Sequence, residues 1–424
     1  MLQTSFIREN LDLTIAGLQK KYFANAESVV NEIISIDDNR KQVQVELDNT
    51  LAEANQLAKE IGALMKSGNK EQAEVAKNRT SVLKALSKDL QEKYTSFEEN
   101  LTNLLLTLPN LPHDSVPAGK TPEENVEVYV VDSIPSLPEG AQPHWDLIKQ
   151  HDIVDFELGN KITGAGFPVY KGKGARLQRA MINFFLDQAV EAGYMEVQPP
   201  ILVNKESGYA TGQLPDKDGQ MYFATEDELY LIPTAEVPIT NIYRDVLLKE
   251  TDLPIKNAGY TPCFRREAGS WGAHGRGLNR LHQFDKVEIV QITLPENSYE
   301  ALQGMRDHVE NLLKKLELPY RILRLCGGDM SFTSALTFDF EVYSAAQQRW
   351  LEVSSVSNFE TYQANRLKLR YKTKEGKSRL LHTLNGSALA LPRILAAILE
   401  NNQQADGSIK IPKVLQGYTN FDTI

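Results

Sequence analysis

Residues 263–289 read CFRREAGSWGAHGRGLNRLHQFDKVEI, and both ends of this stretch have the alternating pattern of a β-strand. At the second end, Phe284, Lys286 and Glu288 fall on one face of a strand, whereas Val287 and Ile289 fall on the other. The glycines in between allow a flexible connection, so the stretch predicts an antiparallel hairpin. One face of this hairpin is charged, and the other can pack into a core.

The charged face of this hairpin has the side chains that a nucleotide requires. A guanidinium group binds two phosphate oxygens at once and keeps its charge at any relevant pH. Phe284 shares the face and could stack on a base, with Arg265 and Arg280 nearby. We therefore expect a nucleoside triphosphate to bind here. A surface hairpin with weak Arg–Glu ion pairs is the alternative, but it leaves Phe284 among the charges unexplained.

The segments around the hairpin predict an antiparallel sheet. Short alternating runs indicate strands at 230–232, 260–268, 281–292, 337–343 and 349–355, and helical patterns occur at 174–193, 297–316 and 386–401. Many of the strands are joined by loops too short for a helical crossover, which favours antiparallel pairing and an α+β fold. A further strand at 194–203 contains Pro199-Pro200, so we expect it at an edge or an interface.

The N-terminal quarter of the chain predicts a long helical hairpin. Residues 27–108 contain no proline and only two glycines, and two apolar series follow the three-four spacing of a coiled-coil seam, interrupted at Arg40 and Thr50. The first series is Ile36, Val43, Leu47, Ala54, Leu57, Ile61 and Leu64; the second is Ala76, Leu83, Leu86, Leu90, Phe97, Leu101, Leu104 and Leu108. The KSGNK sequence at 66–70 separates them and predicts the tip of the hairpin.

Charge is unevenly distributed along this predicted arm. Residues 27–58 carry two basic and seven acidic side chains, whereas residues 59–93 carry eight basic and five acidic ones. Considered alone, this pattern favours an ordinary solvated helix surface.

A proline-rich segment follows the arm. Seven prolines between 109 and 143 exclude a continuous helix, and this segment is therefore predicted to be a linker, with a strand at 126–131. The predicted domains are an N-terminal domain at 1–108, the linker at 109–143 and a C-terminal domain at 144–424.

Composition narrows the possible functions. The formal net charge of −10 argues against general affinity for nucleic acid, so that any such contact needs a local basic patch. The N-terminus lacks the apolar run of a secretory signal, and no run of eighteen apolar residues occurs, so we expect a cytoplasmic protein without a membrane span. Two cysteines supply neither a disulfide framework nor a cysteine zinc site.

Several motifs resemble the class II aminoacyl-tRNA synthetases. FRRE at 264–267, the glycine loop and HQFDKVE at 282–288 resemble motif 2 in the form typical of seryl-tRNA synthetases of the bacterial type. TAEVP at 234–238, EVSS at 352–355, the motif 3 stretch NGSALALPRILAAILEN at 385–401 and the tail IPKVLQGY are similar to the same family. Pro199-Pro200 after the 174–193 helix resembles motif 1, and the helical hairpin also matches. The resemblance covers essentially the whole chain.

The resemblance implies an enzyme that ligates L-serine to tRNA(Ser) with ATP through a seryl adenylate. It implies that Arg265 binds the α-phosphate, that Phe284 stacks on adenine and that Arg393 binds the γ-phosphate. The implied catalytic residues are Arg265, Glu267 and Arg393. The implied ATP-binding residues are Arg265, Arg266, Glu267, Arg280, Phe284, Glu352, Val353, Ser354, Ser355 and Arg393. The implied serine-binding residues are Thr234, Ala235, Glu236, Arg265, Glu288, Asn385 and Ser387.

Cofactor and partners follow from the same resemblance. Glu352 and Ser355 are expected to bind Mg²⁺ together with ATP, and no zinc is expected. In this family the helical hairpin binds the tRNA. The resemblance therefore implies that the basic outer half of the arm contacts tRNA and is not merely a solvated surface. A homodimer is implied, and tRNA(Sec) is a further candidate substrate.

One stretch departs from the family pattern. Where the family commonly has Arg-Asp-Thr, this chain has Ala273-His274-Gly275, with Trp271 two positions earlier, which puts contacts of this loop with the tRNA acceptor end or pyrophosphate in doubt. Two alternatives stay open at this point. One is another class II enzyme, such as a relative that aminoacylates a carrier protein, and the other is a coiled-coil tethering protein with a degenerate synthetase-like body.

Overall fold

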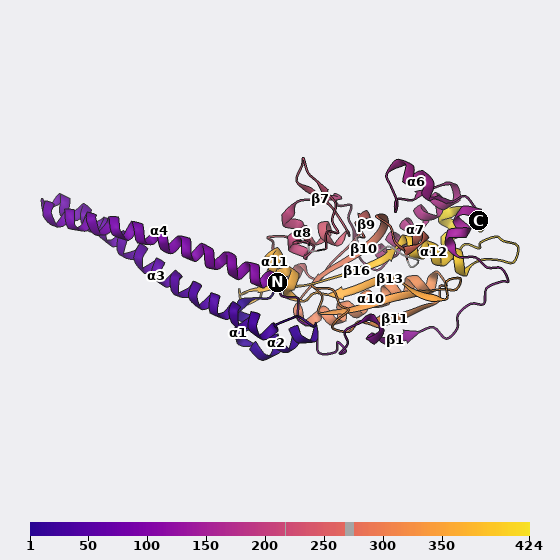
Figure 1. Ribbon diagram of the computed structural model, residues 1–424, viewed down its shortest axis with the longest axis horizontal. Helices are drawn as coiled ribbons and strands as arrows, with labels where there is room; N and C mark the ends of the chain where they lie inside the picture. The colour runs from indigo at the N-terminus through magenta and orange to yellow at the C-terminus, as the bar shows by residue number, and fades with distance from the viewer. Residues whose placement is uncertain (217, 268–274) are drawn as a thin grey trace. The chain divides into compact units, whose positions relative to one another are not determined.

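The computed structural model describes residues 1–216, 218–267 and 275–424 (Figure 1). The chain divides into two compact units, Met1–Pro109 and Asn110–Ile424. The division falls at the first proline after the N-terminal helical region.

The first unit is helical. Its helices are α1 (Thr4–Glu9), α2 (Leu11–Lys20), α3 (Ala26–Lys66) and α4 (Lys70–Thr107). Helices α3 and α4 pack together as an antiparallel hairpin, and this confirms the predicted coiled-coil arm (Figure 1). At about 1.5 Å per residue, each of these helices extends for roughly 60 Å. The turn between them contains Gly68 at φ +81°, a conformation that glycine adopts without steric cost.

The seam of the arm follows the predicted spacing with one exception. Leu47, Leu83 and Leu90 are buried between the two helices, as the three-four pattern requires. Thr50 is accommodated in the seam because its hydroxyl donates to the Glu46 carbonyl oxygen at 2.7 Å. The prediction for Leu86 was wrong: its side chain is 44% exposed, because the seam continues from Leu83 to position 87.

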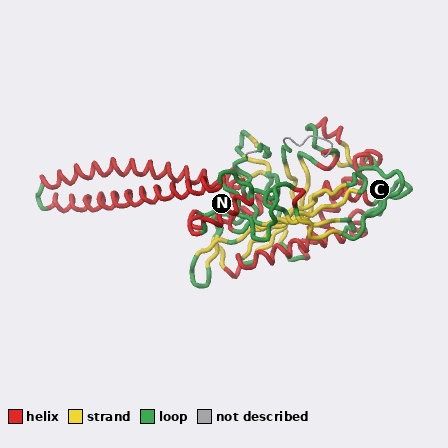
Figure 2. Tube along the Cα trace, turned by 60° about the horizontal axis from the view of Figure 1, so that its bottom comes forward, coloured by secondary structure: helices red, strands yellow, loops and turns green. Residues whose placement is uncertain are grey.

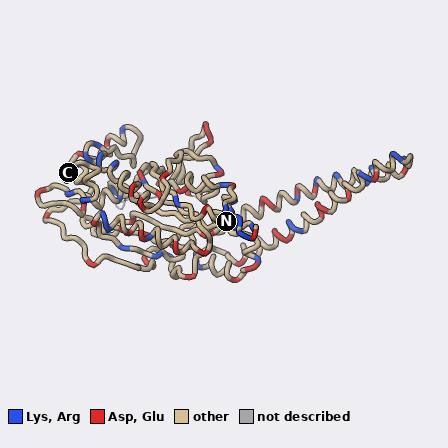
Figure 3. Tube along the Cα trace, turned by 180° about the vertical axis from the view of Figure 1, so that it is seen from behind, with Lys and Arg blue, Asp and Glu red and all other residues tan. Residues whose placement is uncertain are grey.

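Charge along the arm also follows the sequence, with lysine and arginine frequent near the tip and acidic residues frequent near the base (Figure 3).

The second unit is built on a large, mostly antiparallel sheet. Across the described residues, eight strands follow the order β1-β11-β12-β13-β16-β10-β9-β4, and only the pair β4–β9 is parallel. The strands of this sheet are β1 (Val126–Val130), β4 (Met195–Glu196), β9 (Ile255–Phe264), β10 (Gln283–Thr293), β11 (Tyr320–Arg324), β12 (Leu336–Ser344), β13 (Arg349–Asn358) and β16 (His382–Ala390).

Smaller sheets surround it. One consists of β2 (Val154–Asp155) and β3 (Val169–Tyr170). Another has the strand order β5 (Leu202–Val203), β7 (Leu229–Leu231) and β6 (Phe223–Ala224). A third has the order β15 (Ser378–Leu380), β14 (Arg370–Lys372) and β8 (Leu247–Lys249). The 3₁₀ turns are η1 (Pro122–Glu124), η2 (Glu250–Asp252), η4 (Gly277–Asn279) and η5 (Pro295–Asn297).

Helices cover the large sheet and close the core. The helices of this unit are α5 (His144–Gln150), α6 (Phe156–Ile162), α7 (Gly172–Glu191), α8 (Lys205–Thr211), α9 (Glu236–Asn241), α10 (Ser298–Lys315), α11 (Thr361–Leu367), α12 (Leu391–Asn401) and α13 (Lys413–Thr419). Apolar side chains of α7, α10 and α12 pack with Val287 and Ile289 of β10 in one cluster. Figure 2 shows the strands in the middle of the unit and helices along the sheet. The α+β prediction is thereby confirmed.

Three local features refine the sequence interpretation. The strand expected around Pro199-Pro200 is split into β4, at the edge of the large sheet, and β5, in a small one. The helix expected from Gly386 begins only at Leu391, because residues 382–390 form β16, where Gly386 packs against Val356 with no room for a Cβ. Within the segment predicted to be a linker, β1 forms the other edge of the large sheet.

Candidate active site

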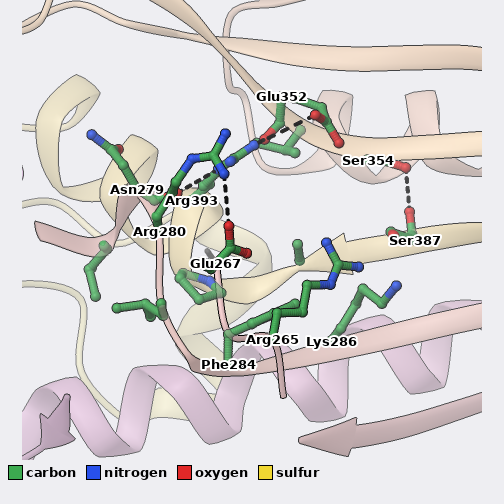
Figure 4. A pocket seen from close by; sticks show the side chains of 15 residues that line it. Arg265, Glu267, Asn279, Arg280, Phe284, Lys286, Glu352, Ser354, Ser387 and Arg393 are labelled. Atoms are coloured by element: carbon green, nitrogen blue, oxygen red, sulfur yellow. Dashed lines mark hydrogen bonds and ion pairs between the residues drawn. The ribbon is translucent and has the colours of Figure 1, made fainter. Parts of the chain in front are cut away.

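A pocket of about 220 Å³ is lined by side chains of β10, β13 and β16, by residues that follow β9, and by the first turn of α12 (Figure 4). It is lined by Arg265, Glu267, Leu278, Asn279, Arg280, Leu281, Phe284, Lys286, Glu352, Val353, Ser354, Ser387, Ala390, Pro392 and Arg393. The structure thus brings together most of the predicted ATP-binding residues with two predicted serine-binding residues, Ser387 and Arg265, the second of which belongs to both predicted sets.

Three guanidinium groups in this pocket are held by hydrogen bonds and ion pairs. Arg280 forms an ion pair with Glu267 at 2.7 Å, and Arg393 donates to the Glu352 carbonyl oxygen at 2.6 Å (Figure 4). Arg265 donates to the Pro233 carbonyl oxygen at 3.2 Å. Such an array can neutralise a polyphosphate, because each group is oriented before the ligand arrives.

Phe284 provides a flat apolar surface among these cations. The Arg265 guanidinium carbon lies 5.2 Å from the centroid of the Phe284 ring. An aromatic face that attracts a guanidinium group can equally stack on a base.

A buried polar cluster adjoins the pocket through Lys286. The Lys286 ammonium donates to Thr234 Oγ1 at 2.8 Å and forms an ion pair with Glu288. Thr234 Oγ1 donates to Glu288 Oε2 at 3.2 Å. The Lys286 and Glu288 side chains are only 6% and 2% exposed, so their charges have little screening by water.

A second carboxyl group belongs to the same cluster. Glu236 accepts a hydrogen bond from Gln363 Nε2 at 2.6 Å and also hydrogen-bonds with Asn385. Burial, reinforced by the negative charge of Glu288, raises the pKa of Glu236 to about 7. Ala235 is fully buried beside it. The cluster therefore holds two buried carboxyl groups, Glu236 and Glu288, beside the Lys286 ammonium group, and a carboxylate is the group that binds an ammonium ligand.

Two predicted ATP-binding residues are placed differently. Arg266 lies over the Tyr222 ring, 4.5 Å from its centroid, and donates to the Met221 carbonyl oxygen at 3.1 Å. Ser355 lies opposite Asp339 in the β12–β13 ladder and hydrogen-bonds to it. Burial and the nearby Glu352 charge raise the pKa of Asp339 well above its usual range.

The sequence did not identify three polar residues that the structure places at or beside the site, Lys286, Asn279 and Gln363. Lys286 could have been found, because strand alternation already puts it on the face shared by Phe284 and Glu288. Asn279 contributes a backbone carbonyl, and Gln363 comes from α11, so neither has a local sequence signal. The Trp271 to His274 part of the atypical loop lies outside the described residues. Of its neighbours, Arg276 is placed over the Trp145 ring at 4.8 Å.

The described residues contain neither a membrane-spanning helix nor a cluster of metal ligands. No helix in the described ranges combines the length and the apolar character needed to traverse a bilayer. Within the same ranges, His, Cys, Asp and Glu side chains do not gather in threes in a way that could bind a metal ion.

Comparisons with known proteins agree with this geometry. Residues 1–112 match the family model described as the seryl-tRNA synthetase N-terminal domain, and residues 222–402 match the class II tRNA synthetase core domain (G, H, P, S and T). The chain is 51% identical to the Serine--tRNA ligase of Salinibacter ruber, with 100% of this chain and 99% of that protein covered.

Solved structures show the same likeness. A seryl-tRNA synthetase from Pyrococcus horikoshii complexed with ATP superimposes with a TM-score of 0.93 at 32% identity, over 100% of this chain and 99% of that chain. A cytoplasmic serine-tRNA ligase from Naegleria fowleri in complex with AMP superimposes with a TM-score of 0.86 at 25% identity, over 100% and 98% of the two chains.

Proposed function

The chain belongs to the serine–tRNA ligase family of class II aminoacyl-tRNA synthetases, and from this premise we propose how its own residues perform the reaction. The family activity is the ATP-dependent attachment of L-serine to tRNA. We propose that this chain makes a seryl adenylate and then charges tRNA(Ser). The observation that best supports the residue assignments is the pocket in which Arg265, Arg280 and Arg393 adjoin a buried acidic cluster.

The pocket residues would bind ATP and align it. Arg265 would move from the Phe284 ring toward the α-phosphate, which leaves the ring face for adenine. Arg393 would bind the γ-phosphate, and Glu267 would keep Arg280 oriented through their ion pair. The serine carboxylate can then attack the α-phosphorus, with pyrophosphate as the leaving group. This step requires alignment and charge neutralisation rather than a nucleophilic side chain.

The buried cluster would select serine. In our proposal Glu288 binds the serine ammonium group, and Thr234, Glu236, Asn385 and Ser387 complete the site. Lys286 forms an ion pair with Glu288, and the ammonium group of serine would take the place of Lys286 in this pair. Lys286 would then be free to bind the reacting carboxylate or the α-phosphate. An analogue without the hydroxyl would leave a buried polar group unpaired and would bind more weakly.

The proposed magnesium site lies at the margin of this pocket, because Glu352 lines the pocket whereas Ser355 is not among its described lining residues. Glu352 and Ser355 would bind Mg²⁺, which supplies Lewis-acid stabilisation of the phosphate charge. Asp339 Oδ1 is buried with no hydrogen-bond partner among the described residues and lies beside Ser355. Burial and the nearby Glu352 charge raise the pKa of Asp339, and a cation would offset the repulsion between the two carboxyl groups.

The arm would bind the tRNA. Phosphate contacts from the basic half of α3 and α4 would recognise RNA shape rather than base sequence. Replacing residues 38–92 by a short linker should leave serine-dependent pyrophosphate exchange largely unchanged, whereas charging of tRNA(Ser) should collapse. Charging at close to the normal rate by the shortened protein, or loss of exchange while it stays folded, would contradict this role.

Three further assignments complete the proposal. A homodimer would form through the α7–β4 region, where Val190 of α7 and Met195 of the edge strand β4 expose apolar side chains. The enzyme would act in the cytoplasm. A charging assay with purified tRNA(Sec) beside tRNA(Ser) tests whether the second RNA is also a substrate, and sedimentation tests the dimer.

A further inference from the structure

A buried histidine–glutamate pair lies behind the wall of the nucleotide pocket. His144 begins α5 and Glu400 lies in the last turn of α12, 256 residues later. Both side chains are 0% exposed. Neither residue lines the pocket, and the proposed mechanism uses neither.

The hydrogen bonds of this pair fix the orientation of the imidazole ring. The Leu278 amide donates to His144 Nε2 at 2.8 Å, so Nε2 is the nitrogen without a hydrogen. Nδ1 therefore carries the hydrogen and donates to Glu400 Oε1 at 2.7 Å. The same Glu400 oxygen accepts from the His144 amide at 2.9 Å and from Gln347 Nε2 at 3.0 Å, while the Ser344 hydroxyl donates to Glu400 Oε2.

These bonds also keep the glutamate ionised. Burial alone would raise the pKa of Glu400, but hydrogen bonds from His144 and Ser344 outweigh burial and hold its pKa below the usual range. A permanently charged acceptor keeps the imidazole in one tautomer, with Nε2 free to accept.

The Leu278 amide, which donates to His144 Nε2, belongs to η4, and this turn approaches the imidazole ring very closely. Gly277 of η4 has φ +67°, and a Cβ at this position would lie 2.4 Å from His144 Nε2. Only glycine therefore allows η4 to reach the imidazole ring. The next residues of the turn, Leu278 and Asn279, line the nucleotide pocket.

The η4 turn also orients two of the arginines that line the pocket, Arg393 and Arg280. Arg393 Nε donates to the Asn279 carbonyl oxygen at 3.0 Å, which holds the guanidinium group across the pocket. Arg280 follows η4 directly and forms the ion pair with Glu267. Hydrogen bonds thus connect Glu400 to His144 and His144 to the Leu278 amide, and the backbone of η4 continues this connection to the Asn279 carbonyl oxygen that binds Arg393.

We propose that His144, oriented by Glu400, is a positioning residue that fixes η4 and thereby holds Arg393 where it meets the terminal phosphates of ATP. This inference rests on the proposed nucleotide site. Its specific consequence is that loss of the Nε2 acceptor weakens binding of a triphosphate but not of AMP, because only the triphosphate has the γ-phosphate assigned to Arg393.

A matched pair of variants separates this role from simple packing. In His144→Asn the amide nitrogen replaces Nδ1 and can still donate to Glu400, but no acceptor reaches Leu278. In His144→Gln the amide oxygen replaces Nε2 and can still accept from Leu278. Calorimetric titration with a non-hydrolysable ATP analogue and with AMP is done for both variants and the unaltered protein, together with thermal unfolding.

We expect H144N to lose roughly tenfold in affinity for the ATP analogue, about the contribution of one hydrogen bond to a charged group. Its affinity for AMP should change less than about twofold, and H144Q should stay closer to the unaltered protein. The double variant His144→Asn with Arg393→Ala should bind the ATP analogue little more weakly than Arg393→Ala alone, because His144 acts through Arg393.

Each other outcome counts against a distinct claim. Equal loss of AMP and analogue binding, or equal behaviour of the two variants, would show that His144 only stabilises the fold. If the unaltered protein bound AMP but showed no added affinity for the triphosphate, the proposed role of Arg393 itself would fail. Should H144N not fold, Gly277→Ala must give the same triphosphate-selective loss, since its Cβ displaces the imidazole ring; unchanged analogue binding in G277A would overturn the proposal.

Discussion

Replacing Glu288 by glutamine removes one buried negative charge and leaves the shape of the side chain nearly unchanged. Glu288 is 2% exposed, forms an ion pair with Lys286 and accepts from Thr234 at 3.2 Å. In the proposed serine site its carboxylate binds the substrate ammonium group. The substitution therefore tests the serine assignment without opening a cavity.

The size of the effect follows from this burial. A hydrogen bond to a charged group contributes about 1.5–3 kcal/mol, and the low exposure of Glu288 places the loss near the upper end of that range. Since each 1.4 kcal/mol is tenfold, the KM for serine should rise by roughly 30- to 150-fold. The KM for ATP should change less than about threefold, because the adenine and phosphate contacts that we assign do not involve Glu288. The Lys286 charge would lose its partner, which lowers the free energy of unfolding by up to about 3–5 kcal/mol.

Pyrophosphate exchange with serine and ATP varied in turn measures both constants. Glu310→Gln is a suitable control, because it makes the same chemical change to an ion-paired glutamate on α10, which pairs with Lys314 away from the pocket. The control should keep both KM values. A higher KM for ATP with an unaltered KM for serine in the Glu288 variant would refute the assignment.

Other predictions follow from the same site and from the arm. Arg265→Ala should abolish adenylate formation while thermal unfolding changes little, because a half-buried arginine contributes modestly to stability; near-normal exchange in the folded variant would show that the α-phosphate assignment is wrong. Because the pKa of Glu236 is raised to about 7 and an ammonium ligand favours the ionised carboxylate, serine binding should release a proton below this pH. The KM for serine should then rise as the pH falls from 7, by at most about tenfold per unit, and Glu236→Gln should flatten this dependence; an equal slope in the variant would reject Glu236 as the titrating group. Phosphate contacts from about three to five basic residues of 59–93 should make tRNA affinity fall by roughly 0.7–0.9 log units per contact per log unit of salt, and a salt-independent affinity would exclude them.

Strand alternation predicted the hairpin well because its signal is local. The assignment of Phe284, Lys286 and Glu288 to one face needs only a period of two, and the structure has these side chains at or beside the pocket. The arm tip was equally predictable, since a Ser-Gly-Asn break interrupts two helical patterns.

Other features depend on contacts between distant parts of the chain. The small and apolar residues of 382–390 fit a strand or a helix, and only pairing with β10 and β13 decides for β16. The pairing of His144 with Glu400 has no local signal, because 256 residues separate them. The roles of individual site residues came from the family resemblance, since periodicity alone cannot distinguish a serine site from another buried acidic cluster.

The alternatives were another class II enzyme and a coiled-coil tethering protein with a degenerate synthetase-like body. Both the length of the chain that resembles serine–tRNA ligases and the motifs themselves argue against them. The likeness to serine–tRNA ligases covers the whole chain, including the arm. The described pocket also contains Arg265, Glu267, Glu352 and Arg393 together, which a degenerate body would not require.

ATP–pyrophosphate exchange by the purified protein, with a panel of amino acids and no tRNA, tests the proposed activity most directly. We expect exchange with L-serine that depends on magnesium and exceeds that with threonine, alanine, glycine and cysteine. Exchange that is strongest with threonine, or absent with every amino acid, would contradict it.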